Sequence, residues 1–121
     1  MTFETQRLGK FIEAKAAASE ILRAEGVKDR AVSFEEGLIM QAASHILASR
    51  ESFYGLEVIR LVAADPGAIY PTLNRFEDTY RMTVSSFENV EYANKHNRRP
   101  RREYQATDFG QTVFRLFTPE K

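Results

Sequence analysis

The residues best equipped to bind a charged ligand form a short basic run near the C-terminal end of the chain. Five cations fall within eight residues, at Lys95, Arg98, Arg99, Arg101 and Arg102. The whole chain has 17 basic and 17 acidic residues, so the rest of it carries 12 basic and 17 acidic residues. Such a concentration of cations on one loop of an otherwise acidic protein favours contact with a nucleic-acid backbone. A solvated, charged loop is the alternative interpretation.

A second group of hydrogen-bonding side chains lies on a helix predicted over residues 68–78. The Asp-Pro-Gly at residues 65–67 is typical of a turn. Apolar residues then recur at a helical period, at Ile69, Leu73 and Phe76. The opposite face and its flanks present Tyr70, Pro71, Thr72, Asn74 and Arg75. Because proline lacks an N–H, we expect Pro71 in the first turn.

This helix has the layout that reading DNA requires, since one face can pack on the protein while the other enters a major groove. Arg75 can bind guanine bidentately and Asn74 can bind adenine, and either pair discriminates by about 1–3 kcal/mol. The alternatives are an ordinary amphipathic helix and, for Arg75, a phosphate contact or a salt bridge. The basic loop at 94–102 would follow the DNA backbone or place an arginine in the minor groove. Its candidate contact residues are Lys95, His96, Asn97, Arg98, Arg99, Arg101 and Arg102.

Helices and one hairpin must position both groups. Capping residues, apolar periods and stop residues predict helices at 5–25, 33–49, 53–64, 68–78 and 108–118. Residues 83–92 and 101–106 predict a β-hairpin with the basic loop at its tip. The expected fold is mainly α with a small β-hairpin, in the α+β class. A helix-turn-helix followed by a hairpin is the order of a winged helix, here one domain over residues 33–118.

An extra helix, within residues 1–26, precedes that domain. Its centre, residues 16–18, consists of three alanines, which have high helix propensity and let another helix approach closely. It either packs on its own domain or forms a dimerisation arm. A homodimer is expected because one protomer neutralises few phosphates and binds weakly, whereas a symmetric dimer can bind a palindromic site.

Three segments resemble the PadR-like transcriptional regulators. The second-helix motif with Gly-Tyr-Glu is similar to residues 54–59, Tyr-Gly-Leu-Glu-Val-Ile. The family's recognition helix, Gly-Thr-Leu-Tyr-Pro-x-Leu-x-Arg-Leu-Glu, resembles residues 67–77, Gly-Ala-Ile-Tyr-Pro-Thr-Leu-Asn-Arg-Phe-Glu. The family's wing resembles residues 98–110, with Asn97 where the wing glycine would be. The resemblance covers Phe34 to Phe117 and implies a winged-helix repressor that binds double-stranded DNA.

The chain departs from that family at two places that bear on assembly. Tyr-Arg-Met at residues 80–82 replaces a common Gly-Leu-Ile. Many members dimerise through a long C-terminal helix, but little follows Gly110 in this chain. The N-terminal helix can take over that role, so either end of the chain can make the dimer.

Enzymatic and membrane functions find little support in the sequence. The two histidines, His45 and His96, lie far apart, and there is no cysteine, HExxH, glycine-rich phosphate loop or Gly-x-Ser-x-Gly. We therefore expect no catalytic residue, no metal site and no cofactor. No apolar stretch approaches the roughly 18 residues of a membrane helix and no secretory leader is visible, so a cytoplasmic protein is expected. A small-molecule effector fits the resemblance, but no residue set for it can be read.

Two other functions fit the same fold. A phage or plasmid DNA-binding factor in segregation or replication would bind tandem sites cooperatively, whereas a repressor would bind a single palindrome near a promoter. A protein-interaction winged helix is the second alternative, and the basic hairpin tip argues against it.

Overall fold

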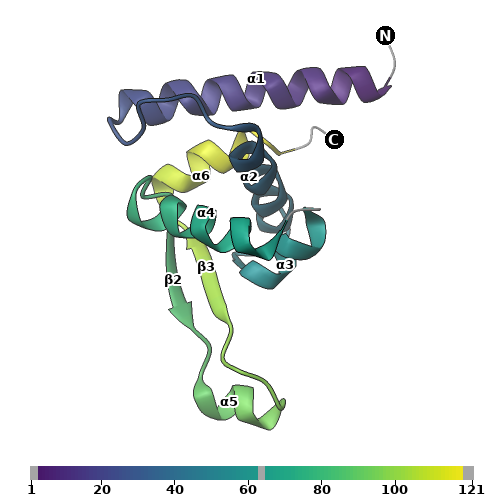
Figure 1. The fold of residues 1–121 in the computed structure, drawn as a ribbon, viewed down its shortest axis with the longest axis vertical. Helices are drawn as coiled ribbons and strands as arrows, with labels where there is room; N and C mark the ends of the chain where they lie inside the picture. The colour runs from purple at the N-terminus through teal and green to yellow at the C-terminus, as the bar shows by residue number, and fades with distance from the viewer. Residues whose placement is uncertain (1–2, 63–64, 119–121) are drawn as a thin grey trace.

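The computed structural model describes residues 3–62 and 65–118 (Figure 1). Its elements, in chain order, are α1 (Phe3–Ala24), α2 (Phe34–Leu47), β1 (Ser52–Tyr54), α3 (Gly55–Leu61), α4 (Pro66–Asp78), β2 (Thr83–Phe87), α5 (Val90–Lys95), β3 (Arg102–Ala106) and α6 (Asp108–Arg115). The strands form one antiparallel sheet in the order β1-β3-β2. A mainly helical chain with a small sheet confirms the predicted α+β class. The predicted end of the third helix, at residues 63–64, lies outside the described residues.

Helix α1 packs on its own chain through one face. The side chains buried there are Phe11, Ala14, Ala18 and Leu22. The chain segment that leads to α2 is also tied to α1, because Lys15 Nζ donates to the Val32 carbonyl at 2.9 Å and the Val32 amide donates to Ser19 Oγ at 2.8 Å. The predicted packing on its own domain is confirmed for this face. Another face leaves Leu8 and Ile12 each 53% exposed.

Helix α2 begins where it was predicted, because Ser33 and Glu36 cap it reciprocally. The Glu36 amide donates to Ser33 Oγ and the Ser33 amide donates to Glu36 Oε1, both at 3.0 Å. The helix contacts α1, α3, α4 and α6 and is central to the core. Its fully buried side chains include Ile39, Met40 and Ala43.

The helix predicted from residue 53 begins later, because Phe53 belongs to a strand. In β1, Phe53 pairs with Tyr104 of β3, and their rings stack with centroids 5.3 Å apart. Three residues are too few for an alternating pattern to be recognised in the sequence. Helix α3 then begins at Gly55, where an added Cβ would lie 2.7 Å from the Tyr70 ring of α4. The glycine therefore allows the close approach of α4.

Helix α4 begins two residues earlier than predicted, at Pro66. The Asp65 side chain caps it by accepting from the Gly67 amide at 2.9 Å. Pro71 consequently lies inside the helix, and its predicted place in the first turn is wrong. At this position the proline removes the hydrogen bond that an N–H would make to the Gly67 carbonyl. The apolar face is buried as predicted, at Ile69, Leu73 and Phe76.

The predicted hairpin is present, but its first strand is shorter than predicted. Strand β2 ends at Phe87, and residues 90–95 form α5 where the sequence pattern predicted more strand. Asn89 caps that helix, since its Oδ1 accepts from the Tyr92 amide at 3.1 Å. Here a local cap outweighs the strand propensity of Val90 and Tyr92. Figure 1 shows the hairpin leaving the body on the side away from α1, with α5 at its far end.

The two ends of the hairpin meet at the Met82 carbonyl. The Thr107 amide donates to that carbonyl at 2.9 Å, and Thr107 Oγ1 donates to the Arg81 carbonyl at 2.8 Å. Thr107 also caps α6 by accepting from the Gly110 amide at 2.9 Å. A Cβ on Gly110 would lie 1.8 Å from the Met82 oxygen, so only glycine fits there.

Candidate nucleic-acid interface

The exposed face of α4 contains four of the five residues predicted to contact DNA from this helix. These exposed residues are Tyr70, Pro71, Asn74 and Arg75. Thr72 is buried, and its hydroxyl donates to the Ala68 carbonyl at 2.9 Å. A helical hydroxyl that bonds to the carbonyl four residues earlier is satisfied within the protein. The prediction that Thr72 faces DNA is therefore wrong.

Arg75 is held by two contacts within the protein. Its Nη2 donates to Thr72 Oγ1 at 3.0 Å, and its Nε lies 3.6 Å from Glu36 Oε2. The alternative of a salt bridge for Arg75 is thus present in the structure. The side chain is still 46% exposed, so the guanidinium can also meet a ligand.

Glu36 is a buried carboxylate with partners from three segments. Its Oε2 accepts from the Tyr80 hydroxyl at 2.6 Å, and its Oε1 lies 3.2 Å from Lys28 Nζ. Burial alone would raise the pKa of Glu36, but the Ser33 amide, the Tyr80 hydroxyl and the Lys28 ammonium outweigh it and lower that pKa. Burial and the neighbouring carboxylate raise the pKa of Tyr80, which keeps its hydroxyl protonated as a donor. The ionised Glu36 therefore joins α2, the end of α4 and the loop after α1.

Arg102 joins the hairpin to α4. Its guanidinium donates to Asn74 Oδ1 at 3.0 Å, to Glu77 Oε2 at 3.2 Å and to Ser85 Oγ at 2.8 Å. The same group lies 5.2 Å from the centroid of the Tyr104 ring. A guanidinium that the sequence predicts to contact DNA thus has partners inside the protein. It fixes the far end of the β2–β3 ladder, where it pairs with Phe87, against the exposed edge of α4.

Glu88 pairs with two further arginines of the hairpin. Arg98 Nη2 lies 2.6 Å and Arg101 Nη2 lies 3.1 Å from Glu88 Oε2. Burial opposes ionisation of Glu88, but hydrogen bonds from these arginines lower its pKa. The Arg101 guanidinium also lies 4.1 Å from the centroid of the Tyr54 ring. The hairpin therefore presents less uncompensated positive charge than the basic run predicts.

Lys95, Arg99 and His96 complete the exposed polar surface of the hairpin tip. Within the described parts of the chain, the side chains of Lys95 and Arg99 make no hydrogen bond or ion pair. His96 Nδ1 lies 2.9 Å from the Tyr92 carbonyl oxygen. The centroids of the His96 and Tyr92 rings are 4.3 Å apart. Lys95 and Arg99 are thus the cations of the basic run that are available to bind phosphate.

Asn97 adopts the left-handed conformation, with φ of 54°. It ends α5 in a Schellman motif, in which the Asn97 amide donates to the Asn94 carbonyl at 3.0 Å and the Arg98 amide donates to the Ala93 carbonyl at 3.1 Å. Asparagine tolerates this conformation better than other residues with a side chain. The left-handed conformation that ends α5 therefore suits an asparagine at this position.

Phe87 is an interface candidate that the sequence analysis did not select. It shares a face of the hairpin with the buried Tyr104, so alternation alone would place it in the core. Its ring is instead 71% exposed, because the hairpin extends beyond the body of the protein. Only the three-dimensional arrangement shows this exposure.

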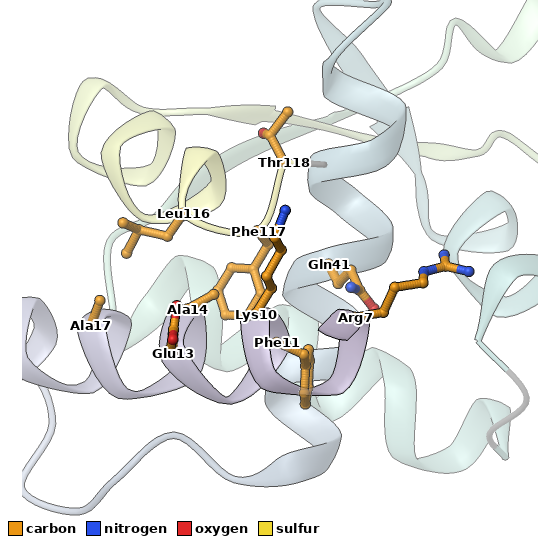
Figure 2. A pocket seen from close by; sticks show the side chains of 10 residues that line it. All are labelled: Arg7, Lys10, Phe11, Glu13, Ala14, Ala17, Gln41, Leu116, Phe117 and Thr118. Atoms are coloured by element: carbon orange, nitrogen blue, oxygen red, sulfur yellow. The ribbon is translucent and has the colours of Figure 1, made fainter. Parts of the chain in front are cut away.

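A groove with a volume of 580 Å³ lies between α1 and the residues that follow α6 (Figure 2). Its lining includes the small side chains of Ala14 and Ala17, together with Lys10 and Phe117. The volume lies within the range of about 300–1,000 Å³ found for small-molecule sites. A small-molecule effector stays a prediction, and this groove is the first place to test for one.

Metal and membrane functions gain no support from the described residues. No group of three or more His, Asp or Glu side chains among them could hold a metal ion. In residues 3–62 and 65–118, no helix combines the length and apolar character needed to cross a membrane.

Comparisons with protein-family models, with curated proteins and with solved structures find no match. The function must therefore be inferred from the chain's own residues.

Proposed function

We propose that this protein is a sequence-specific double-stranded DNA-binding protein, a dimeric PadR-like winged-helix repressor. Helix α4 would enter the major groove while the hairpin meets the adjacent backbone. The order of elements supports this proposal, because α2, β1, α3, α4 and the β2–β3 hairpin follow the order of a winged helix.

The contact between Asn74 and Arg102 carries the proposal. Asn74 belongs to the exposed face of α4, and Arg102 begins β3. Their hydrogen bond of 3.0 Å joins the exposed edge of α4 to the far end of the β2–β3 ladder, where Arg102 pairs with Phe87. One duplex laid against α4 can therefore reach the hairpin as well, where Lys95 and Arg99 can bind phosphates.

The residues divide into those that read bases and those that bind the backbone. Arg75 is the best base reader, since Thr72 and Glu36 orient its guanidinium while leaving it partly exposed. Tyr70 and Asn74 are also exposed on the same helix. Arg98 and Arg101 contribute less to phosphate binding than Arg99, because they must compete with Glu88 for their guanidinium groups.

Selection from random duplexes, followed by binding measurements on the winning duplex and on a random one, tests this function. We expect Arg75→Ala to reduce the preference for the selected duplex by about 1–3 kcal/mol. Arg99→Ala should weaken binding to both duplexes and lower the salt slope by about 1. Arg23→Ala, an exposed arginine of α1, is the control that should change neither.

Failure to enrich any duplex would refute the proposed function. Equal losses on both duplexes for Arg75→Ala would refute only its reading role. Cooperative binding to tandem copies of the selected site would favour a segregation or replication factor, whereas one palindrome would favour a repressor.

The dimer is proposed to form through α1. Leu8 and Ile12 are four residues apart and exposed on one side of that helix, and Phe34 at the start of α2 is also exposed. Deleting the helix would remove core residues, so the test is the double substitution Leu8→Lys with Ile12→Lys. We expect a monomer by light scattering. Leu61→Lys on α3, where the leucine is 52% exposed, is the matched control, and a surviving dimer in the double variant would exclude this interface.

A further inference from the structure

Phe87 is the most exposed large apolar side chain in the described part of the protein, at 71%. It ends β2, where the hairpin has left the body and α5 has not yet begun. Isolated apolar residues are common on surfaces. The position of Phe87 relative to α4 sets it apart from such isolated residues.

The strand register places Phe87 on the side of the hairpin that faces α4. Phe87 pairs with Arg102 and Ser85 pairs with Tyr104, so these side chains lie on one face of the two strands. Arg102 reaches Asn74 of α4 from that face, at 3.0 Å, and its guanidinium lies 6.0 Å from the centroid of the Phe87 ring. Phe87 therefore continues the surface formed by α4 and Arg102.

The shape of the hairpin limits what can enter a DNA groove. Its tip is the helix α5, and an α-helix with side chains is about 10–12 Å wide. The minor groove is only about 6 Å wide, so this tip cannot enter it as a unit. A single projecting side chain can enter, and phenylalanine is one of the apolar residues that proteins insert between base steps.

The charges around Phe87 fit the same partner. Arg102 beside the ring is held by Asn74 and Glu77, but Lys95 and Arg99 at the tip are exposed and can bind phosphates. Cations that bind the two phosphate backbones on either side of the minor groove would hold an apolar side chain at its entrance.

We propose that Phe87 is an apolar wedge that enters the minor groove of the bound duplex, partly unstacks one base step and bends the DNA toward the major groove that holds α4. This inference rests on the proposed function. It adds a bend to that function, and it assigns the bend to one side chain.

The test measures bending of the selected duplex, by energy transfer between dyes at its ends and by electrophoresis with circularly permuted sites. The wild-type protein should bend the duplex by about 20° or more. Phe87→Ala should lose at least half of that bend and weaken binding, whereas Phe87→Leu should keep most of it, because leucine also serves as a wedge. Thermal unfolding of each variant shows whether the hairpin is intact.

Val84 provides the matched control. It lies on the same strand but on the opposite face, where it pairs with Gln105, and it is 53% exposed. Val84→Ala should therefore leave both bend and affinity unchanged. An equal loss of bend in Val84→Ala, or lost affinity in Phe87→Ala without lost bend, would overturn the proposal. A selected duplex that stays straight would refute the wedge alone, whereas no selected duplex would refute the proposed function itself.

Discussion

Two glutamates organise the cations of this protein, one in the body and one on the hairpin. Glu36 is only 4% exposed and joins Lys28 and Arg75, which come from different segments of the chain. Glu88 joins two arginines of the same hairpin. Each carboxylate binds two cations, but Glu36 binds cations from different segments whereas Glu88 binds cations of one hairpin.

The two glutamates are expected to have different roles, Glu36 in the stability of the fold and Glu88 in DNA binding. A buried carboxylate that loses its charge leaves desolvated partners behind, so the body depends on Glu36. Glu88 is itself only 9% exposed, but Arg98 and Arg101 are 28% and 37% exposed. Solvent therefore screens these ion pairs, and the two arginines can exchange Glu88 for phosphates. Substitution of Glu36 should therefore affect folding, and substitution of Glu88 should affect binding.

The largest expected effect is that of Gly110→Ala in the body. The added Cβ would lie 1.8 Å from the Met82 oxygen, and backbone must move to relieve the overlap. We expect the free energy of unfolding to fall by about 3 kcal/mol or more, measured by urea denaturation. Gly9→Ala is the control, because a Cβ at Gly9 would meet no atom within 4 Å. Gly26→Ala would not serve as a control, because the positive φ of Gly26 disfavours alanine. An unchanged free energy of unfolding in Gly110→Ala would contradict the close contact between Gly110 and the Met82 carbonyl.

Glu36→Gln should have the next largest effect. The amide keeps the shape of the side chain and can still accept from the Ser33 amide, but it loses the charge that faces Lys28. Hydrogen bonds to charged groups contribute about 1.5–3 kcal/mol, so we expect a loss of about 2 kcal/mol by the same denaturation method. Glu35→Gln, an exposed neighbour on α2, should change little.

The pH dependence of stability should show whether the charge of Glu36 stabilises the fold. The folded-state pKa of Glu36 is lowered, so its contribution to stability is complete above the ordinary value of 4.5 and is lost as pH falls below it. The difference in melting temperature between wild type and Glu36→Gln should thus shrink as pH is lowered from 7 to 3. A constant difference over that range would show that the charge of Glu36 is not what stabilises the fold.

Glu88→Gln should have the smallest effect on folding and a visible effect on binding. Removing the charge releases Arg98 and Arg101 for phosphate contacts. We expect the melting temperature to stay close to that of the wild type and DNA affinity to rise, by less than about tenfold at moderate salt. Glu91→Gln, exposed on α5, is the control for a simple change in net charge. Equal gains in both variants would mean that the release of the two arginines is not the cause.

The features that could be predicted from sequence are local ones. The capping box of Ser33 and Glu36, the apolar face of α4 and the position of the hairpin depend on residues close together in the chain. The α+β class follows from these elements. Strand β1 could not be predicted, because its pairing partner lies about fifty residues away in β3.

The predicted interface was harder to judge, because its side chains have partners that spacing cannot show. Thr72 has suitable chemistry for DNA but is buried. Arg102 belongs to the basic run, yet it binds Asn74 of α4. Phe87 is the reverse case, because its place in the alternation is typical of a core residue but its side chain is exposed. Burial and long-range pairing decide these three cases.

The joint at Met82 has a consequence for how such a protein can change. Because the chain departs at Met82 and returns at Thr107 across one hydrogen bond of 2.9 Å, residues 83–106 form a detour whose entrance and exit coincide. The strands of this hairpin cannot be exchanged freely, because Tyr104 is fully buried, β3 also pairs with β1, and Arg102 meets α4. The segment beyond the strands, residues 88–101, can be shortened, lengthened or exchanged while the sheet keeps its pairing. New binding preferences can therefore be engineered on the tip of the hairpin without redesigning the core.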